Sequence, residues 1–266
     1  MTEAIQFTIK DMRFYVRNAP MRMPFRFGSV TLTASAILYV RTEIERADGQ
    51  RATGWAADML APKWYDKDPA KDYAESLEEL LDSVRAAGDI YEQIGREANS
   101  VFRMWQQGYE EMMAWRQQRG INRLMASNGA SLQERALIDA VGIASGLSYH
   151  NLLSSGALGI QLGEVHEELG HMSVGHAIPP TPLARLSVRH TVGLIDPIRT
   201  RDIALENALA DGLPQSLEDY VGAQGIRYVK IKIGGDAQSD FGRLSEIAAL
   251  LDEQCQDAYC VTLDGN

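Results

Sequence analysis

The amino-acid sequence predicts an α+β segment followed by an α/β segment with a parallel sheet. Three patterns lead to this prediction. Residues 5–17 and 30–46 are rich in β-branched and aromatic types, residues 69–119 carry apolar side chains at three- and four-residue spacing, and strand and helix patterns alternate after about residue 186. Strands followed by helices are typical of α+β domains, whereas strands alternating with helices indicate βαβ units and a parallel sheet.

The α+β segment is expected to open on a small antiparallel sheet. The composition predicts strands over residues 5–17 and 30–46 and a short third strand near residues 53–57. Residues 18–29 and 58–68 are expected to be loops, because they carry prolines, aromatics and cations. Loops of this composition are found both as surface connections and as ligand contacts, and the pattern leaves both open.

Helices are expected next. The apolar spacing predicts helices between residues 69 and 119, and a further helix over residues 132–147, with Ser131 as its N-cap and Glu134 placed for a capping box. Residues 151–186 are rich in Gly, Ser and Pro and are predicted to be a connector. The chain is thus divided into a first domain of residues 1–150, the connector 151–186, and a second domain that begins at residue 187 and extends to residue 266.

The second domain is predicted to be strand, helix, strand, helix, strand. The strands are expected over residues 188–195, 227–233 and 259–263, and the helices near residues 216–223 and 239–252. Strands at this spacing are typical of parallel βα folds, whose ligand sites lie at the carboxyl ends of the strands.

Composition excludes several classes of protein. Of the 266 residues 45% are hydrophobic and 23% are charged, which is typical of folded globular domains and not of disordered chains. The formal net charge of −10 argues against a nucleic-acid partner, and no apolar run is long enough for a membrane span. The amino-terminal residues lack the pattern of a signal peptide and the two cysteines fit a reducing compartment, so we expect a cytoplasmic protein.

The strongest chemical signal is a strand with two lysines. In residues 228–235 the side chains of Lys230 and Lys232 lie on one face, because successive side chains of a strand alternate between faces. Two cations in a partly desolvated place lower each other's pKa, so one of them can act as a base near neutral pH. The alternative is an edge strand with two solvated lysines that prevent pairing with other chains.

The second signal is the end of the last strand. Residues 259–266 form an apolar strand that ends in Asp264, Gly265 and Asn266. A carboxylate at the carboxyl end of a parallel strand can bind a hard cation such as Mg²⁺. Asp-Gly-Asn is also common in ordinary turns, so this motif alone is weak.

Taken together, the two motifs resemble the enolase superfamily, and within it the mandelate racemase/muconate lactonizing enzyme group. The lysine pair precedes the Asp264 strand end by about 30 residues. The early strands and helices resemble the capping domain of that group, residues 21–28 resemble its first specificity loop, and residues 134–142 resemble the helix that leads into its barrel. The resemblance covers nearly the whole chain.

The resemblance implies a fold and a reaction. The fold would be an α+β capping domain followed by an α/β TIM-type (β/α) barrel, of which this chain holds the first three strands. The enzymes are isomerases or lyases (racemases, cycloisomerases, epimerases or acid-sugar dehydratases) that remove a proton α to a carboxylate and use Mg²⁺ to stabilise the enediolate. Lys232 matches the general base, Lys230 the residue that lowers its pKa and contacts the substrate carboxylate, and Asp264 the first of three carboxylate metal ligands.

The resemblance also implies contacts to the rest of the substrate. Arg22, Arg26, Trp64 and Tyr65 lie in the cap loops and are candidates for binding the distal part of a small carboxylic acid. Asn266 lies next to the site and is a further candidate for a substrate contact. A homo-oligomer is expected for the complete enzyme.

Two further features bear on these expectations. A full barrel needs about 250 residues, whereas only about 80 follow residue 186, so we expect the chain to be the N-terminal part of a longer enzyme. His166, His171 and His176 recur every five residues, a spacing that points them in different directions on a helix and argues against a zinc site. The alternatives that stay open are a non-catalytic carboxylate-binding α/β protein and a truncated interaction module.

Overall fold

The computed structural model describes residues 3–27, 30–255 and 257–265. Contacts divide the chain into two units: the first comprises Met1–Ala19 and Ser35–Pro182, and the second comprises Pro20–Ala34 and Leu183–Asn266. None of the helices in the described ranges is long and apolar enough to cross a membrane.

The first sheet has three strands in the order β1-β2-β3, with β1 at Phe7–Phe27, β2 at Val30–Arg46 and β3 at Arg51–Met59. Strands β2 and β3 pair antiparallel, from Ile37 opposite Met59 to Glu45 opposite Arg51. The predicted antiparallel sheet is therefore confirmed.

The loop predicted at residues 18–29 is wrong, because β1 continues to Phe27. Pro20 and Pro24 lie inside this strand although proline has no backbone N–H. They are tolerated because β1 is an edge strand of the sheet, where a missing donor need not break the pairing between two strands.

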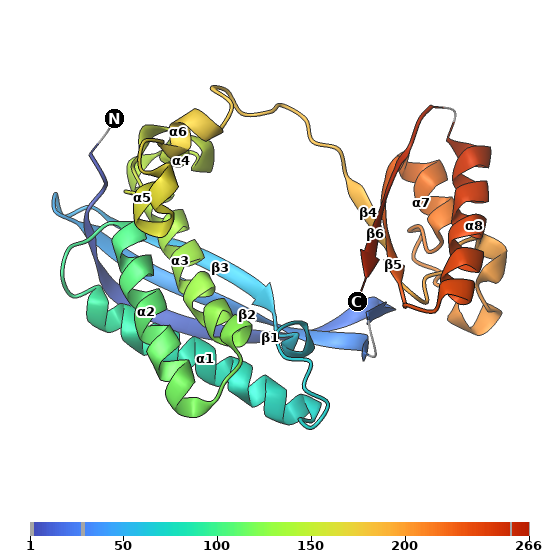
Figure 1. Ribbon diagram of the computed structural model, residues 1–266, viewed down its shortest axis with the longest axis horizontal. Helices are drawn as coiled ribbons and strands as arrows, with labels where there is room; N and C mark the ends of the chain where they lie inside the picture. The colour runs from blue at the N-terminus through green and yellow to red at the C-terminus, as the bar shows by residue number, and fades with distance from the viewer. Residues whose placement is uncertain (1–2, 28–29, 256, 266) are drawn as a thin grey trace. The chain divides into compact units, whose positions relative to one another are not determined.

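Three helices cover one face of this sheet: α1 at Tyr73–Ile94, α2 at Val101–Arg119 and α3 at Arg123–Ser145 (Figure 1). The start of α1 is fixed by a capping box in which the Asp72 carboxylate accepts a hydrogen bond from the Glu75 backbone N–H. Sheet and helices share one apolar core, and its fully buried members include Phe7, Leu38, Val40, Ile44, Leu80, Tyr91, Met104, Met112, Met125, Leu132 and Leu137.

Helix α3 begins nine residues before the predicted start. Its N-cap is Asn122, whose side-chain oxygen accepts a hydrogen bond from the Leu124 backbone N–H at 2.8 Å. The expectation that Ser131 caps this helix is therefore wrong, and Ser131 lies in the helix interior. The Ser-x-x-Glu pattern misled the prediction because residues 123–130 can continue the helix, and their burial against α1 and α2 stabilises it there.

After α3 the chain forms short elements only. Helix α4 spans Tyr149–Ser155, α5 spans Leu162–Val165 and α6 spans Val174–Ala177. Leu152, Ala157 and Leu158 belong to the core of the first unit, so the early part of the segment expected to be a connector packs on it. Single 3-10 turns lie at Pro62–Trp64 and Glu167–Leu169 in this unit, and at Thr200–Asp202 and Leu205–Asn207 in the second.

The second unit contains a parallel sheet in the order β4-β5-β6. Strand β4 spans Arg189–Val192, β5 spans Tyr228–Ile233 and β6 spans Cys260–Gly265. Along the chain, α7 at Leu217–Gln224 lies between β4 and β5, and α8 at Ala237–Gln254 lies between β5 and β6 (Figure 1). The predicted alternation of strands and helices is confirmed. The aliphatic face of β5 and the helices form a second core, which contains Val192, Leu217, Val221, Val229, Ile231, Ile247, Leu250 and Leu251.

Gly54 is required where β3 meets α3. A Cβ built at this position would lie 2.2 Å from both the Ala136 carbonyl oxygen and the Ala140 backbone nitrogen. We expect Gly54→Ala to destabilise the first unit by about 2–3 kcal/mol, because the strand and helix backbones would have to separate. Urea unfolding followed by tryptophan fluorescence measures this loss, since Trp55, Trp64, Trp105 and Trp115 all belong to the first unit.

The matched control is Ala57→Ser, which also adds one heavy atom to β3 but at an exposed position. Its free energy of unfolding should stay within about 0.5 kcal/mol of the original chain. Equal stabilities of the Gly54→Ala and Ala57→Ser variants would show that the close approach of β3 and α3 is not needed.

Glu134 makes the stability of the first unit depend on pH. Burial on α3 raises the pKa of its carboxyl from 4.5 to about 7, and Arg135 opposes the rise only partly. The folded state therefore binds this proton more tightly than the unfolded chain, so the contribution of Glu134 to stability is fully present below pH 4.5 and is lost as the pH rises through about 7. We expect Glu134→Gln to remove this fall and to add about 2–3 kcal/mol at pH 8.

The same tryptophan signal, recorded at pH 5 and pH 8, tests the effect. Glu110→Gln, at an exposed position on α2, is the control and should keep the pH dependence of the original chain. A Glu134→Gln variant whose stability still falls between the two pH values would rule out Glu134 as the cause.

Candidate functional site

The register of β5 and β6 brings three charged side chains to one face of the parallel sheet. Lys230 lies opposite Thr262, and Lys232 lies opposite Asp264. Val229 and Ile231, which alternate with the lysines, are buried in the core beneath α8. Lys230, Lys232 and Asp264 therefore share the face that is turned away from the helices.

Both lysines bind the same carboxylate oxygen. The Nζ of Lys230 lies 2.8 Å and the Nζ of Lys232 lies 2.9 Å from Asp264 Oδ2. The side chain of Lys232 is 11% exposed, compared with 26% for Lys230 and 29% for Asp264. The two ammonium groups are thus close neighbours around one counter-ion, and Lys232 is the more shielded from water.

These contacts control the ionisation of Asp264. The hydrogen bond from Lys230, followed by that from Lys232, lowers the pKa of Asp264 from 3.8 to about 2. The carboxylate is therefore ionised at every pH at which the protein is expected to work.

The backbone just after Lys232 is hydrogen-bonded to Asp240, a residue that was not among the predicted site residues. The backbone N–H groups of Gly234 and Gly235 both donate to the Asp240 carboxylate at 2.8 Å. Gly235 has a φ of 90°, a left-handed conformation that favours glycine. The signal was present in the sequence as two glycines between a strand and a helix with an aspartate in its first turn.

A second group of polar residues lies at the end of β4, towards the helices. The His190 ring contacts the Tyr220 ring in a tilted arrangement with 4.4 Å between centroids, and burial lowers the pKa of His190. Arg243 donates to the carbonyl oxygens of Gly193 at 2.8 Å and Asp196 at 2.7 Å. The Asp196 carboxylate in turn accepts from the Gly193 N–H at 2.7 Å, which ends β4 three residues before the predicted end.

The predicted substrate contacts are in different parts of the structure. Arg22 and Arg26 belong to the second unit, as do the lysines, whereas Trp64 and Tyr65 belong to the first. Trp64 is 41% exposed, and the Tyr65 hydroxyl accepts a hydrogen bond from Asn128 at 2.8 Å.

The two arginines differ in their partners. Arg22 is bound to Asp211 and to neighbouring carbonyl groups. The side chain of Arg26 is exposed and makes no ion pair or hydrogen bond with any residue of the described ranges. The predicted contact Asn266 lies outside the described residues.

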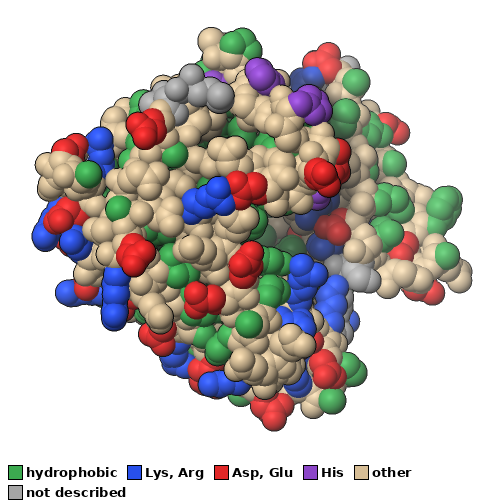
Figure 2. Space-filling model, turned by 60° about the vertical axis from the view of Figure 1, so that its left-hand side comes forward, with side chains coloured by type: hydrophobic (Ala, Val, Ile, Leu, Met, Phe, Trp, Pro, Cys, Tyr) green, Lys and Arg blue, Asp and Glu red, His purple; other side chains and the backbone are tan. Residues whose placement is uncertain are grey.

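The fit to a metal ion is poor for the residues described. In the ranges that the structure describes, no group of three or more His, Cys, Asp or Glu side chains is arranged to hold a metal. Asp264 could provide a single ligand, and its Oδ2 already accepts from two ammonium groups. Histidine side chains gather at the top of the face in Figure 2, and His166, His171 and His176 are all exposed. Asp264 and the other described His, Cys, Asp and Glu side chains do not make up a Mg²⁺ site by themselves.

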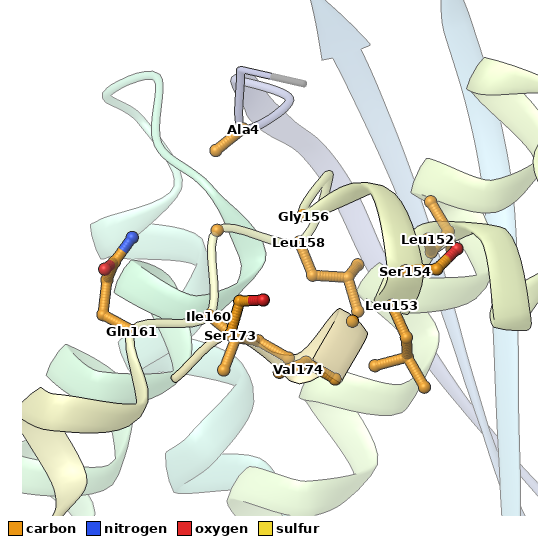
Figure 3. Close-up of a pocket in the computed structure, with 12 residues that line it drawn as sticks. Ala4, Leu152, Leu153, Ser154, Gly156, Leu158, Ile160, Gln161, Ser173 and Val174 are labelled. Carbon is orange, nitrogen blue, oxygen red and sulfur yellow. The ribbon is translucent and has the colours of Figure 1, made fainter. Parts of the chain in front are cut away.

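A cavity of about 240 Å³ in the first unit offers no such chemistry (Figure 3). Its walls are mostly aliphatic, with Leu152, Leu153, Leu158, Ile160 and Val174 around it. Ser154, Gln161 and Ser173 are its polar side chains, and none of the residues that line it is titratable. The lysine and aspartate cluster of the second unit is therefore the better candidate for a reaction.

The low pKa of Asp264 is a test of this geometry. We expect its carboxyl to titrate at about 2 in the original chain. In Lys230→Met the pKa should rise by about one unit, because one charged hydrogen-bond donor is lost, and in Lys230→Met/Lys232→Met it should rise further. Carboxyl ¹³C NMR measures both shifts, with the exposed Asp48 of the first unit as an internal reference. A constant Asp264 titration in the three proteins would contradict the contacts.

Comparison with known proteins supports the fold. No family model and no curated protein matches the sequence. A solved structure of an enolase from Bradyrhizobium, complexed with magnesium and mandelic acid, is similar with a TM-score of 0.57 at 17% identity, over 98% of this chain and 54% of that one. The L-Ala-D/L-Glu epimerase from Bacillus subtilis gives 0.54 at 18% identity, over 97% and 53%.

A mandelate racemase/muconate lactonizing enzyme-like protein from Rubrobacter xylanophilus gives a TM-score of 0.53 at 13% identity, over 97% of this chain and 52% of that one. The chain thus spans about half the length of the solved structures that it matches. Together with the antiparallel sheet and the parallel βα units, these matches show that the chain has the fold of the corresponding half of these structures, which is the fold that the resemblance to the mandelate racemase/muconate lactonizing enzyme group implied.

Proposed function

We propose that this chain contributes the proton-abstracting side of a site that acts on a small carboxylic acid. The observation that supports it most is the pair of lysines around Asp264, at the carboxyl ends of two adjacent parallel strands. Ligand sites of parallel βα folds lie at this edge. The reaction is the removal of a proton α to a carboxylate, which makes the enzyme an isomerase or a lyase: a racemase, epimerase, cycloisomerase or acid-sugar dehydratase.

The two lysines have different roles in this proposal. Lys232 is the general base, because its side chain is the more shielded of the two from water and it is the lysine that the resemblance assigns to this role. Lys230, which is more exposed, binds the substrate carboxylate, and this contact places the α-carbon beside the amine of Lys232.

Asp264 holds both lysines in position before the substrate binds. A Mg²⁺ ion, when bound, would supply positive charge to the enediolate, as the resemblance implies. Because the described residues offer one carboxylate for it, the roles of the lysines are derived without the metal. The further metal ligands, the rest of the barrel, a homo-oligomer and a cytoplasmic location remain part of the proposal.

Hydrogen–deuterium exchange of a substrate α-proton tests the proposed function. Mandelate and L-Ala-L-Glu are suitable probes, because similar folds are known with mandelic acid bound and as an L-Ala-D/L-Glu epimerase. The full protein that carries this chain is incubated with each acid in D₂O, with and without Mg²⁺, and ¹H NMR follows the loss of the α-proton signal. We expect Mg²⁺-dependent exchange that falls at least 10³-fold in Lys232→Ala.

The control variant is Lys10→Ala, which removes a lysine of the first unit that pairs with Glu45. It should leave the exchange rate unchanged. Exchange that persists in Lys232→Ala would overturn the assignment of the base. Tight binding of the acids without any exchange, and without an effect of Mg²⁺, would favour a carboxylate-binding protein that carries out no reaction.

A further inference from the structure

All three guanidinium nitrogens of Arg22 donate hydrogen bonds to one loop that is distant in the sequence. Its Nε donates to Asp211 Oδ2 at 2.6 Å, and its Nη2 donates to Asp211 Oδ1 at 2.9 Å. Nη1 donates to the Pro214 carbonyl oxygen at 2.9 Å, and Nη2 also donates to the Leu213 carbonyl oxygen at 3.0 Å. A guanidinium has five N–H donors, and these contacts use four of them, so one is left for a ligand.

The 205–215 loop, which contains the partners of Arg22, is stabilised by hydrogen bonds between its own residues. The Asp211 carboxylate also accepts from the Leu213 backbone N–H at 3.1 Å. The Gln215 amide donates to the Asn207 carbonyl oxygen at 2.7 Å and accepts from the Leu209 N–H at 3.0 Å. Asp211 is thus presented by a fixed backbone, and the pair with Arg22 has the bidentate geometry that gives specific orientation.

The pair is charged over the whole working range. The hydrogen bond from Arg22 lowers the pKa of Asp211 from 3.8 to about 2. Among the described residues of segment 20–34, Arg22 makes every hydrogen bond that joins a side chain of this segment to residues 183–265. Arg22 therefore attaches the segment to the 205–215 loop through four hydrogen bonds.

The contact lies beside a cavity of about 400 Å³ in the second unit. Arg22, Met23 and Pro24 form one wall, while residues 195–197 and 206–209 form the others together with Gln215. A volume of this size is in the range of small-molecule sites. Residues 195–197 begin three residues after the end of β4, so the cavity is at the same carboxyl edge of the sheet as Lys232 and Asp264.

We propose that Arg22 is a positioning residue: its guanidinium fixes segment 20–34 to the 205–215 loop. This contact thereby fixes the position of Met23 in the wall of the cavity. This differs from the role of a substrate contact that the sequence suggested, because a ligand carboxylate would have to displace Asp211. Arg26 is the matched comparison, since it is a second arginine of the same segment, exposed and without such partners. The inference does not depend on the proposed reaction.

Hydrogen–deuterium exchange of the protein, followed by mass spectrometry, measures the attachment. We expect Arg22→Gln and Asp211→Asn each to speed exchange at least fivefold in peptides from residues 20–27 and 205–215. Arg22→Gln/Asp211→Asn should be no faster than either single variant, because both changes break the same contact. Arg26→Gln should exchange like the original chain. Arg22→Lys should restore only part of the protection, since an ammonium cannot bind both carboxylate oxygens and two carbonyl groups in the same plane.

The Met23 methyl group reports on the cavity wall itself. With ¹³C-methyl methionine, Arg22→Gln should shift the Met23 resonance and increase its broadening by a paramagnetic co-solute, whereas Arg26→Gln should do neither. Unchanged exchange and an unchanged Met23 signal in Arg22→Gln would overturn the proposal, as would equal effects of Arg26→Gln. If Arg22→Gln does not fold, Asp211→Asn carries the same test, because it leaves the arginine in place.

Discussion

The pairing of β5 with β6 is the constraint on which the candidate site depends. Lys232 lies opposite Asp264 only in this register, and a slip of one residue would send the carboxylate to the other face of the sheet. The register is held from the opposite side, because Val229 and Ile231 are buried beneath α8 and cannot exchange places with the lysines without exposing aliphatic surface and burying charge. One face of β5 therefore packs in the core of the second unit, and its other face carries the lysines of the candidate site.

The alternation of residues 228–233 could be predicted because it is a local pattern of period two. The same pattern gave the common face of Lys230 and Lys232, but not their distance to Asp264, which depends on the pairing of strands about 30 residues apart in the sequence. The start of α3 could not be predicted from Ser131, because Ser-x-x-Glu is compatible with a helix interior and tertiary packing decided the outcome. Local signals predicted most of the helices and strands, whereas packing decided where they begin and end.

Arg22 shows the same limit for a functional residue. The resemblance made Arg22 a candidate for a substrate contact, and nothing nearby in the sequence indicates another partner. The partner is Asp211, which is 189 residues away and is presented by the hydrogen bonds of its own loop. Arg26 has the same charge and the same neighbourhood in the sequence but lacks such a partner. The difference between the two arginines is therefore a property of the fold and not of the local pattern.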